Sequence, residues 1–303
     1  MALTSVGSMD GVIVVDKPVG WTSHDVVGKM RRIAGTKRIG HLGTLDPIAT
    51  GVLPLVIGTA TRLAQFYNAA EKVYEAVVRF GFATDTYDRA GVPAGEPVPV
   101  TLNRERLEAE LSRFVGRIQQ TPPAVSAKKI GGVPSYKLAR QKKPVSLAPV
   151  EIEIYEARLT GIEGETASIL VSCSTGTYVR SIAHDLGQAL GCGAHLHALR
   201  RTRSGEFDIS QARSIAALEI LRAEDALPQV LIPSAELLAA FPVVRVDPLT
   251  AAQIRQGRDF HSSPFNVPRN SRHVKAIDEY GALVAIGELV APNLYHPSVV
   301  MTT

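Results

Sequence analysis

A segment rich in glycine between Lys37 and Gly51 limits the possible folds of this chain more than any other stretch. It reads KRIGHLGTLDPIATG, and its three glycines allow backbone conformations that other residues avoid. Pro47 has no N–H group and disfavours the helical conformation for Asp46 before it. The segment is therefore predicted to be a shaped loop, neither a helix nor a regular strand. The apolar run VLPLVI that follows must be buried, so the loop presents the Asp46 carboxylate from a rigid support. At this point an Asp–Pro turn with only a structural role remains the alternative.

The chain has 303 residues, which suits one large domain and a small one. Its two cysteines, Cys173 and Cys192, form no CxxC pattern, so neither a zinc site nor a disulfide framework is indicated. We therefore expect a reducing, cytoplasmic setting. No apolar run approaches the roughly 18 residues of a membrane span. The N-terminus lacks the features of a signal peptide, and residues 1–10 are expected to form a disordered leader, with Met9 as a possible start of the folded part.

Hydrophobic periodicity predicts strands and helices in mixed order. The strand from Lys72 to Phe80 places Tyr74 on its apolar face, where a buried phenol needs a hydrogen-bond partner. A Tyr with only a core role is the alternative. The other expected strands are 11–16, 52–57, 150–159 and 165–173, and the expected helices are 25–34, 59–70, 103–118, 179–190, 214–221 and 234–239.

The C-terminal part begins a new pattern at Phe241. A strand over 241–246 precedes a helix with Asp247 at the N-cap, Pro248 at its first position and Gly257 beyond its end. A strand hairpin is expected over 274–289. These elements predict a self-contained α+β unit of about sixty residues.

Three basic clusters lie near residues 29–38, 113–143 and 200–203. From Leu111 to Val150 there are eight Lys or Arg residues and no acidic residue. A mobile basic arm that contains an aromatic residue, Tyr136, favours contact with a nucleic-acid backbone over an ordinary solvated surface. The formal net charge of +4 permits such a partner without requiring it.

Arg180 falls in the first turn of the helix that begins after Tyr178, where a cation opposes the helix dipole. A cation in that position usually has an anionic partner, and Asp46 is a candidate. No phosphate-binding glycine loop or set of metal ligands is evident. One loop carboxylate, one Tyr and one Arg suit chemistry on a base by an aspartate that an arginine holds ionised.

The motifs of this chain closely resemble those of the TruB family of tRNA pseudouridine synthases. The resemblance covers residues 11 to 205 and rests on five stretches in the family's order: KPVGWTS from Lys17, GHLGTLDPIATGVL from Gly40, KVY from Lys72, GTYVRSI from Gly176, and HLHALRRT from His195. The C-terminal unit resembles a PUA-type RNA-binding domain more weakly, and residues 291–303 fit no pattern.

The resemblance implies an α+β fold with a mixed or antiparallel central sheet, flanking helices and a small PUA-like domain. The implied division is a catalytic domain over 11–238, a basic RNA-clamping insertion over 122–148 within it, and the PUA-like domain over 239–303. The implied activity is isomerisation of uridine 55 in the T loop of tRNA to pseudouridine. No cofactor or metal is implied; the partner is the T-arm of tRNA, no membrane is involved, and we expect a monomer.

The resemblance also implies the roles of individual residues. Asp46 is the implied catalytic aspartate, Arg180 its partner, and Tyr74 the residue that stacks on the base and later acts as a general base. Substrate contacts are implied for His41, which would enter the RNA where the flipped base had been, and for Tyr178, Leu199, Lys17 and Asp88, although Asp85 is an alternative to Asp88. The expected contacts to the RNA backbone are Arg38, Lys128, Lys129, Lys142, Lys143, Arg200 and Arg201.

Two other functions use the same residues differently. A non-catalytic RNA chaperone would fold tRNA with the basic clusters alone, and the chain could also combine this role with catalysis. A hydrolase that uses Asp46 and His41 on a glycosidic bond would release free uracil, but such enzymes commonly need a second carboxylate. Whether Asp46 would add to the base, add to the sugar or remove a sugar proton is not determined by the sequence.

Overall fold

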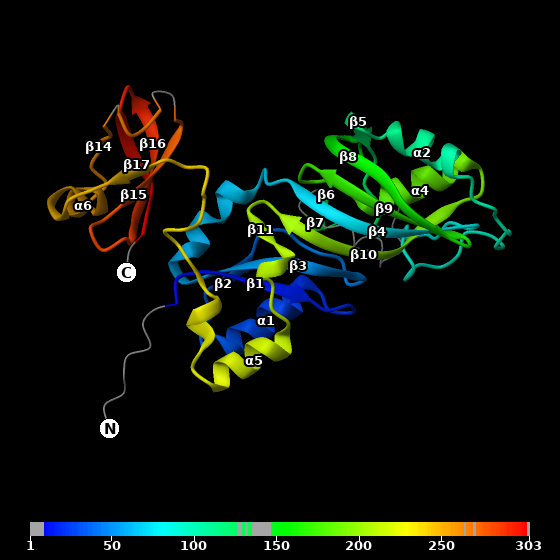
Figure 1. The fold of residues 1–303 in the computed structure, drawn as a ribbon, viewed down its shortest axis with the longest axis horizontal. Helices are drawn as coiled ribbons and strands as arrows, with labels where there is room; N and C mark the ends of the chain where they lie inside the picture. Colours follow the sequence, from blue (N-terminus) through cyan, green and yellow to red (C-terminus); the bar gives the residue numbers. More distant parts are fainter. Residues whose placement is uncertain are drawn as a thin grey trace.

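The computed structural model describes residues 9–125, 129–130, 133–134, 147–263, 265–268 and 271–301. A long mixed sheet forms the main unit, and a smaller sheet forms the C-terminal unit at its side (Figure 1). The fold is α+β, as expected. None of the described helices is long and apolar enough to span a membrane.

The main sheet has the strand order β12-β1-β3-β10-β4-β9-β8-β5, with β2 paired to β3 and β11 paired to β10. Most neighbours are antiparallel, but β10 runs parallel to β3. Its strands are β1 (Gly11–Lys17), β2 (Ile39–His41), β3 (Ala49–Ile57), β4 (Lys72–Phe80), β5 (Gly116–Gln120), β8 (Val150–Glu163), β9 (Thr166–Cys173), β10 (Ala194–Ser204), β11 (Phe207–Asp208) and β12 (Ile232–Pro233). A separate hairpin joins β6 (Lys129–Ile130) and β7 (Val133–Pro134).

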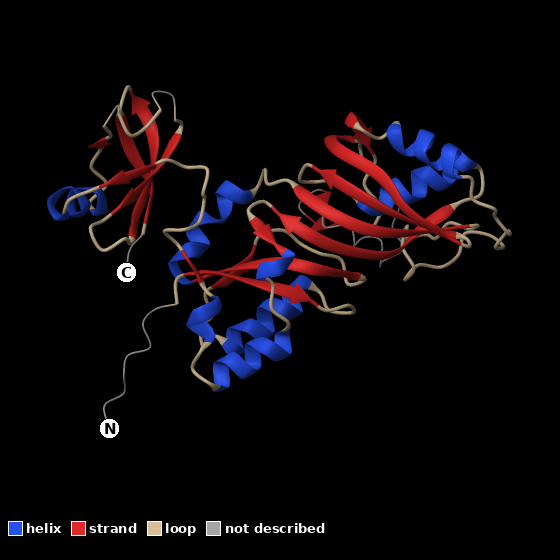
Figure 2. Cartoon of the chain, in the orientation of Figure 1, coloured by secondary structure: helices blue, strands red, loops and turns tan. Residues whose placement is uncertain are grey.

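Helices cover the two ends of this sheet (Figure 2). The first pair, α1 (Ser23–Ile33) and α5 (Ile215–Ala223), packs near β1, and the second pair, α2 (Arg104–Ser112) and α4 (Val179–Leu190), packs against β8 and β10. One continuous apolar core joins the inner faces of α1 and α4, through residues such as Met30 and Ile182. Short 3-10 helices are η1 (Gly58–Tyr67), η2 (Ile209–Gln211) and η3 (Leu227–Val230).

The C-terminal unit contains a sheet of order β13-β15-β16-β17-β14 and the helix α6 (Pro248–Arg255). Its strands are β13 (Val243–Arg245), β14 (Phe260–His261), β15 (His273–Ile277), β16 (Leu283–Ala291) and β17 (Leu294–Val300). Asp247 caps α6, as predicted, by accepting a hydrogen bond from the Thr250 N–H at 2.9 Å.

The C-terminal unit is less independent than expected. It has its own core, but its residues Ile286 and Val299 belong instead to an apolar cluster that includes Val56 and Leu63 of the main unit. The buried Lys275 ammonium donates to the carbonyl groups of Ala235 and Leu237 in the connecting segment, both at 2.9 Å. The two units are therefore joined by packing as well as by the chain.

Several sequence-based expectations were wrong. The helix expected over 103–118 ends at Ser112, and β5 begins at Gly116, whose φ of +104° breaks the helix. The segment 234–239 forms turns rather than a helix, and η1 replaces the α-helix expected over 59–70. The loop expected over 37–51 is shorter, because β2 and β3 take its two ends.

The folded part begins before residue 11, where the expected division placed its start. Met9 packs against the main core, and Asp10 accepts a hydrogen bond from the Thr59 N–H. Met9 and Asp10 therefore belong to the folded part, and residues 1–8 lie outside the described residues.

We expect replacement of Gly51 by Ala to destabilise the sheet beside the loop. Gly51 has φ of +98°, and a Cβ there would lie 2.2 Å from the Arg201 carbonyl oxygen on β10. Strain and overlap together predict a loss of about 3 kcal/mol or more in the free energy of unfolding. Urea denaturation measures it.

Gly35→Ala is the matched control, because Gly35 also has positive φ, +67°, but a Cβ there meets nothing within 4 Å. It should cost about 1–2 kcal/mol. Equal losses for the two variants would contradict the role of close strand contact at Gly51.

Candidate active site

The loop between β2 and β3 is fixed at several points along its backbone. Leu45 is buried, its N–H donates to the Ser23 hydroxyl at 2.8 Å, and the same hydroxyl donates to the Leu45 carbonyl at 3.2 Å. The Ala49 N–H closes a turn on the Asp46 carbonyl at 3.0 Å. These contacts tie the loop that carries Asp46 to Ser23, the first residue of α1.

The Lys17 side chain is fully buried and also contacts this loop, at Pro47. Its ammonium donates to the carbonyl groups of Pro18 and Trp21 and lies 3.5 Å from that of Pro47. Burial lowers the pKa of Lys17 to about 8. The structure gives no support to the expected substrate contact of Lys17, because its side chain has no exposed surface and serves these carbonyl groups.

Arg201 is also fully buried, in the middle of β10. Its guanidinium donates to the carbonyl groups of Val52 at 2.8 Å, Gly43 at 3.1 Å and Thr44 at 3.5 Å. The structure therefore gives no support to the predicted contact of Arg201 with an RNA phosphate. The residue instead joins β10 to β3 and to the loop that carries Asp46.

Arg180 and Asp46 form the ion pair that the helix position predicted. The Nε of Arg180 lies 2.8 Å from Asp46 Oδ2, and its Nη2 donates to Asp46 Oδ1 at 3.1 Å. The remaining Nη1 donates to the carbonyl groups of Val125 at 2.9 Å and Thr86 at 3.2 Å. The Arg180 side chain is 4% exposed and that of Asp46 35%, so the carboxylate is oriented from one side and open on the other.

A cavity of about 210 Å³ opens beside this ion pair. Asp46 is the only carboxylate among the described residues that line it. Tyr74, Tyr178 and Leu199 form part of its wall. The full lining is Gly43, Thr44, Leu45, Asp46, Lys72, Tyr74, Thr175, Gly176, Thr177, Tyr178, Val179, Arg180 and Leu199.

Tyr74 lies on the inward face of β4, and 7% of its surface is exposed. Burial raises the pKa of Tyr74, and the positive charge of Arg201 partly opposes that rise. The phenol is therefore neutral near pH 7. A neutral phenol is not a base in the resting site.

Tyr178 is positioned through its backbone, immediately before α4. Its N–H donates to Gln120 Oε1 at 2.8 Å, and its carbonyl accepts from Gln120 Nε2 at 3.1 Å. The last residue of β5 thus fixes the approach to α4 and to Arg180.

His41 lines a second, smaller cavity of about 110 Å³ next to the first. Burial, followed by the charge of Arg201, lowers the pKa of His41, so its imidazole is neutral near pH 7. Its buried Nδ1 has no hydrogen-bond partner among the described residues.

Asp88, and not Asp85, is the acidic residue close to the ion pair. Asp88 Oδ2 lies 3.9 Å from Arg180 Nε, and Oδ1 accepts from the Thr86 hydroxyl at 2.7 Å. Asp85 instead accepts from the Val92 N–H at 2.8 Å and stabilises its own loop. Asp88 does not line the cavity, so its contact with the site passes through Arg180.

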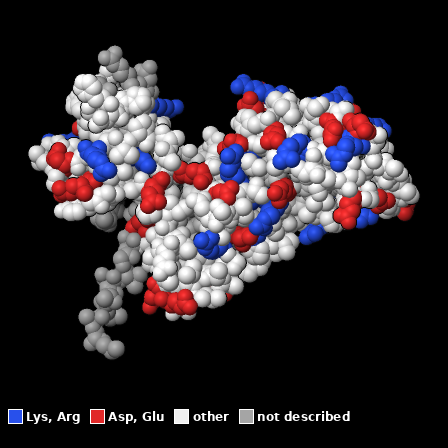
Figure 3. Space-filling view, in the orientation of Figure 1, with Lys and Arg blue, Asp and Glu red and all other residues white. Residues whose placement is uncertain are grey.

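The predicted cationic contacts have different surroundings. Arg38 donates to the Thr61 hydroxyl at 3.1 Å and is exposed, and Arg200 pairs with Asp16 at 2.8 Å with partial exposure. On the face shown in Figure 3, positive and negative side chains are interspersed, without a continuous basic surface. Lys128, Lys142 and Lys143 lie outside the described residues, and for Lys129 only the backbone is described.

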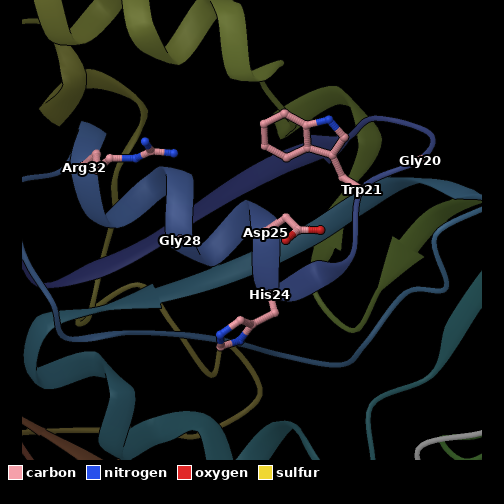
Figure 4. Close-up of a pocket in the computed structure, with 6 residues that line it drawn as sticks. All are labelled: Gly20, Trp21, His24, Asp25, Gly28 and Arg32. Atoms are coloured by element: carbon pink, nitrogen blue, oxygen red, sulfur yellow. The ribbon is translucent and has the colours of Figure 1, made fainter. Parts of the chain in front are cut away.

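A wider hollow of about 560 Å³ lies along the outer side of α1 (Figure 4). It shares no lining residue with the Asp46 cavity, and the Asp25 carboxylate in it is used by the capping box with Thr22. Trp21 and Arg32 lie toward its two ends. The basic cluster at residues 29–38 is thus partly a feature of this outer surface.

Sequence reasoning missed Lys72 and Thr175 as lining residues. Lys72 is two positions before Tyr74 on β4, and alternation along a strand places both side chains on the same face. That alternation could have identified Lys72. Thr175 lies in the turn between β9 and α4, and no local pattern marks its side chain.

Comparison with known proteins adds independent information. Residues 31–179 match the family model described as "TruB family pseudouridylate synthase (N terminal domain)", and residues 180–239 match "tRNA pseudouridylate synthase B C-terminal domain". A protein of Solibacter usitatus named tRNA pseudouridine synthase B is 62% identical over 97% of this chain and 100% of its own length. A protein of the same name from Syntrophotalea carbinolica is 45% identical over 79% of this chain and 78% of its own.

Solved structures share the fold. A chain in the crystal structure of a Cbf5–Nop10–Gar1 complex is 26% identical with a TM-score of 0.70, over 94% of this chain and 80% of the other. A chain in the structure of an archaeal box H/ACA Nop10–Cbf5 complex has a TM-score of 0.72 at 23% identity, over 99% and 89%. These matches extend across the main unit and the C-terminal unit.

Replacing Arg201 by Met should destabilise the fold, because three carbonyl groups around a buried guanidinium lose their donors. We expect a loss of about 3 kcal/mol in the free energy of unfolding, measured by urea denaturation. Arg203→Met is the matched control on the same strand, since Arg203 forms a half-exposed pair with Glu71. Its cost should stay below about 1 kcal/mol. A stable Arg201→Met protein would show that the buried guanidinium is dispensable.

Proposed function

The chain belongs to the TruB family of pseudouridylate synthases, and we propose that it isomerises uridine 55 in the T loop of tRNA to pseudouridine. One observation carries the chemical part of this proposal. Asp46 is the only carboxylate among the described residues that line the cavity, and Arg180 orients it from one side. The position-specific part rests on the motifs that this chain shares with the family.

The reaction needs no co-reactant, because pseudouridine contains the same atoms as uridine. The bond from C1′ of the ribose to N1 of the uracil breaks, the uracil turns, and its C5 bonds to C1′. C5 loses its proton and N1 gains one. A single oriented carboxylate is sufficient for addition to the base, for addition to the sugar or for removal of a sugar proton. Hydrolysis of the glycosidic bond would instead favour two carboxylates facing the substrate, and Asp88 does not reach the cavity.

The size of the cavity supports recognition of a single base. Its volume of about 210 Å³ lies below the 300–1,000 Å³ that is typical of sites for larger ligands. Removing a base from its stack costs a few kcal/mol. Stacking on an aromatic side chain returns about 1–3 kcal/mol, and we assign this role to Tyr74, with Leu199 and Tyr178 completing the wall.

His41 is proposed to fill the position that the base leaves. Its neutral imidazole lines the smaller cavity next to the Asp46 cavity, and a neutral ring can enter an RNA stack without adding charge. Asp88 is proposed to act on Arg180 and not on the base.

We propose that the tRNA backbone is held at several separate places. Arg38 and Arg200 are exposed or partly exposed cations of the main unit, and the basic insertion over 122–148 supplies the others. The PUA-like unit over 239–303 is proposed as a further RNA contact, which is supported by the strongly exposed aromatic residues Phe265 and Tyr280. RNA chaperone activity would use these same contacts.

Asp46→Asn should abolish pseudouridine formation without preventing RNA binding, because the amide keeps the shape and loses the charge. We expect a rate at least about a hundredfold lower, measured by pseudouridine mapping of a T-arm RNA, with a Kd close to that of the wild type.

Asp259→Asn, in the C-terminal unit, is the control and should retain turnover. Undiminished pseudouridine formation by Asp46→Asn would remove Asp46 from the mechanism, whereas release of free uracil by the wild type would favour a hydrolase.

Replacement of Lys128, Lys129, Lys142 and Lys143 by Gln should weaken RNA binding and its dependence on salt. Four lost phosphate contacts predict a decrease of about 3 in the slope of log K against log salt. The matched control replaces the same four residues by Arg, which keeps their charge. An unchanged slope in the Gln variant would contradict the proposed clamp.

A further inference from the structure

Lys72 lies between two cavities. It lines the Asp46 cavity and also the smaller cavity of His41, and only Gly43 and Thr175 share this position among the described residues. A nucleotide that moves from the side of His41 to the side of Asp46 must carry its sugar and phosphate across this boundary. Among the described residues, Lys72 is the one cationic residue that lines both cavities, so it lies beside this path.

The side chain of Lys72 has unused capacity to bind an anion. Its ammonium group has three donors, and the one hydrogen bond that the structure assigns to it is to the Ala70 carbonyl at 3.1 Å. Among the described residues, no carboxylate lies within ion-pair distance of Lys72. A largely buried cation without an anionic partner is costly, and a bound anion relieves that cost.

The charges around Lys72 also favour an anionic ligand. The positive groups at this loop are Lys17, Lys72, Arg180 and Arg201. Of the three nearby carboxylates, Asp46 and Asp88 lie against Arg180, and Asp25 forms the capping box of α1. Burial and then the charge of Arg201 lower the pKa of Lys72 to about 8. The site therefore carries more positive than negative charge before the substrate arrives.

Gly43 keeps the ammonium accessible from the loop side. It has φ of +106°, and a Cβ there would lie 3.4 Å from Lys72 Cε and 3.6 Å from an Arg201 Nη atom. A larger side chain at this position would cover the boundary between the two cavities.

We propose that Lys72 binds the phosphodiester next to the target uridine when its base enters the Asp46 cavity. This inference rests on the proposed function, because it requires a flipped nucleotide. A phosphate fits the observations better than a base carbonyl, since Lys72 lies where the two cavities meet, and a full negative charge balances the excess of cations.

The test is a double-mutant cycle that combines one substitution in the protein with one modification in the RNA. T-arm RNAs carry a single uncharged methylphosphonate linkage, either immediately 5′ or immediately 3′ of the target uridine, and Kd is measured for wild type and Lys72→Met. For the wild type, one of the two linkages should weaken binding about tenfold or more. On unmodified RNA, Lys72→Met should bind with an affinity lower than that of the wild type by a similar factor. The methylphosphonate should weaken binding by Lys72→Met little further.

Two further variants sharpen the cycle. Lys72→Arg, which keeps the charge, should retain most of the affinity. Lys29→Met is the control outside both cavities, since Lys29 pairs with Glu219, and it should show the full methylphosphonate effect. The slope of log K against log salt should decrease by about 1 in Lys72→Met alone.

The proposal is overturned if the methylphosphonate costs the wild type and Lys72→Met the same factor, or if neither linkage affects the wild type. The second result requires no variant, so misfolding of Lys72→Met cannot obscure it. Pseudouridine formation by the wild type on unmodified RNA is measured separately. Absence of pseudouridine would overturn the proposed function. If pseudouridine forms but the effects of Lys72→Met and of the methylphosphonate on binding are additive, only the role of Lys72 is overturned.

Discussion

The buried guanidinium of Arg201 is the interaction on which the geometry of this site depends. It donates to carbonyl groups of β3 and of the loop that carries Asp46, while its own backbone lies against Gly51. One side chain thus joins β10 to β3 and to the loop before it, which lie about 150 residues earlier in the sequence. Because its donors serve backbone carbonyls, it positions the loop without neutralising the Asp46 carboxylate, which remains available to Arg180.

Alternation along β10 explains why Arg200 and Arg201 have different surroundings. Arg200 and Arg201 are adjacent in a basic cluster, and a cluster alone suggests one exposed surface. In a strand, however, successive side chains point to opposite faces. Arg200 reaches Asp16 with partial exposure, whereas Arg201 enters the core. The same alternation placed Tyr74 correctly, and it would have found Lys72.

Local rules predicted some elements well and others badly. The Asp46–Arg180 pair followed from a helix dipole argument, which depends only on the first turn of α4. The helix expected over 103–118 was wrong because its apolar spacing continued through Gly116, where the backbone turns into β5. The lining role of Thr175 depends on how a turn meets β4 and β10 in space, and no pattern within that turn records this.

The 3-10 helix η1 connects the His41 cavity to the C-terminal unit. Ala64, Tyr67 and Asn68 line the His41 cavity, while Arg62 donates to the Val300 carbonyl and Phe66 packs edge-on against Phe241 of the C-terminal unit. One short rigid element therefore sets the spacing between the two units. The residues that line the His41 cavity and those that hold the C-terminal unit thus belong to one short segment, so a shift of η1 would move the cavity wall and the C-terminal unit together.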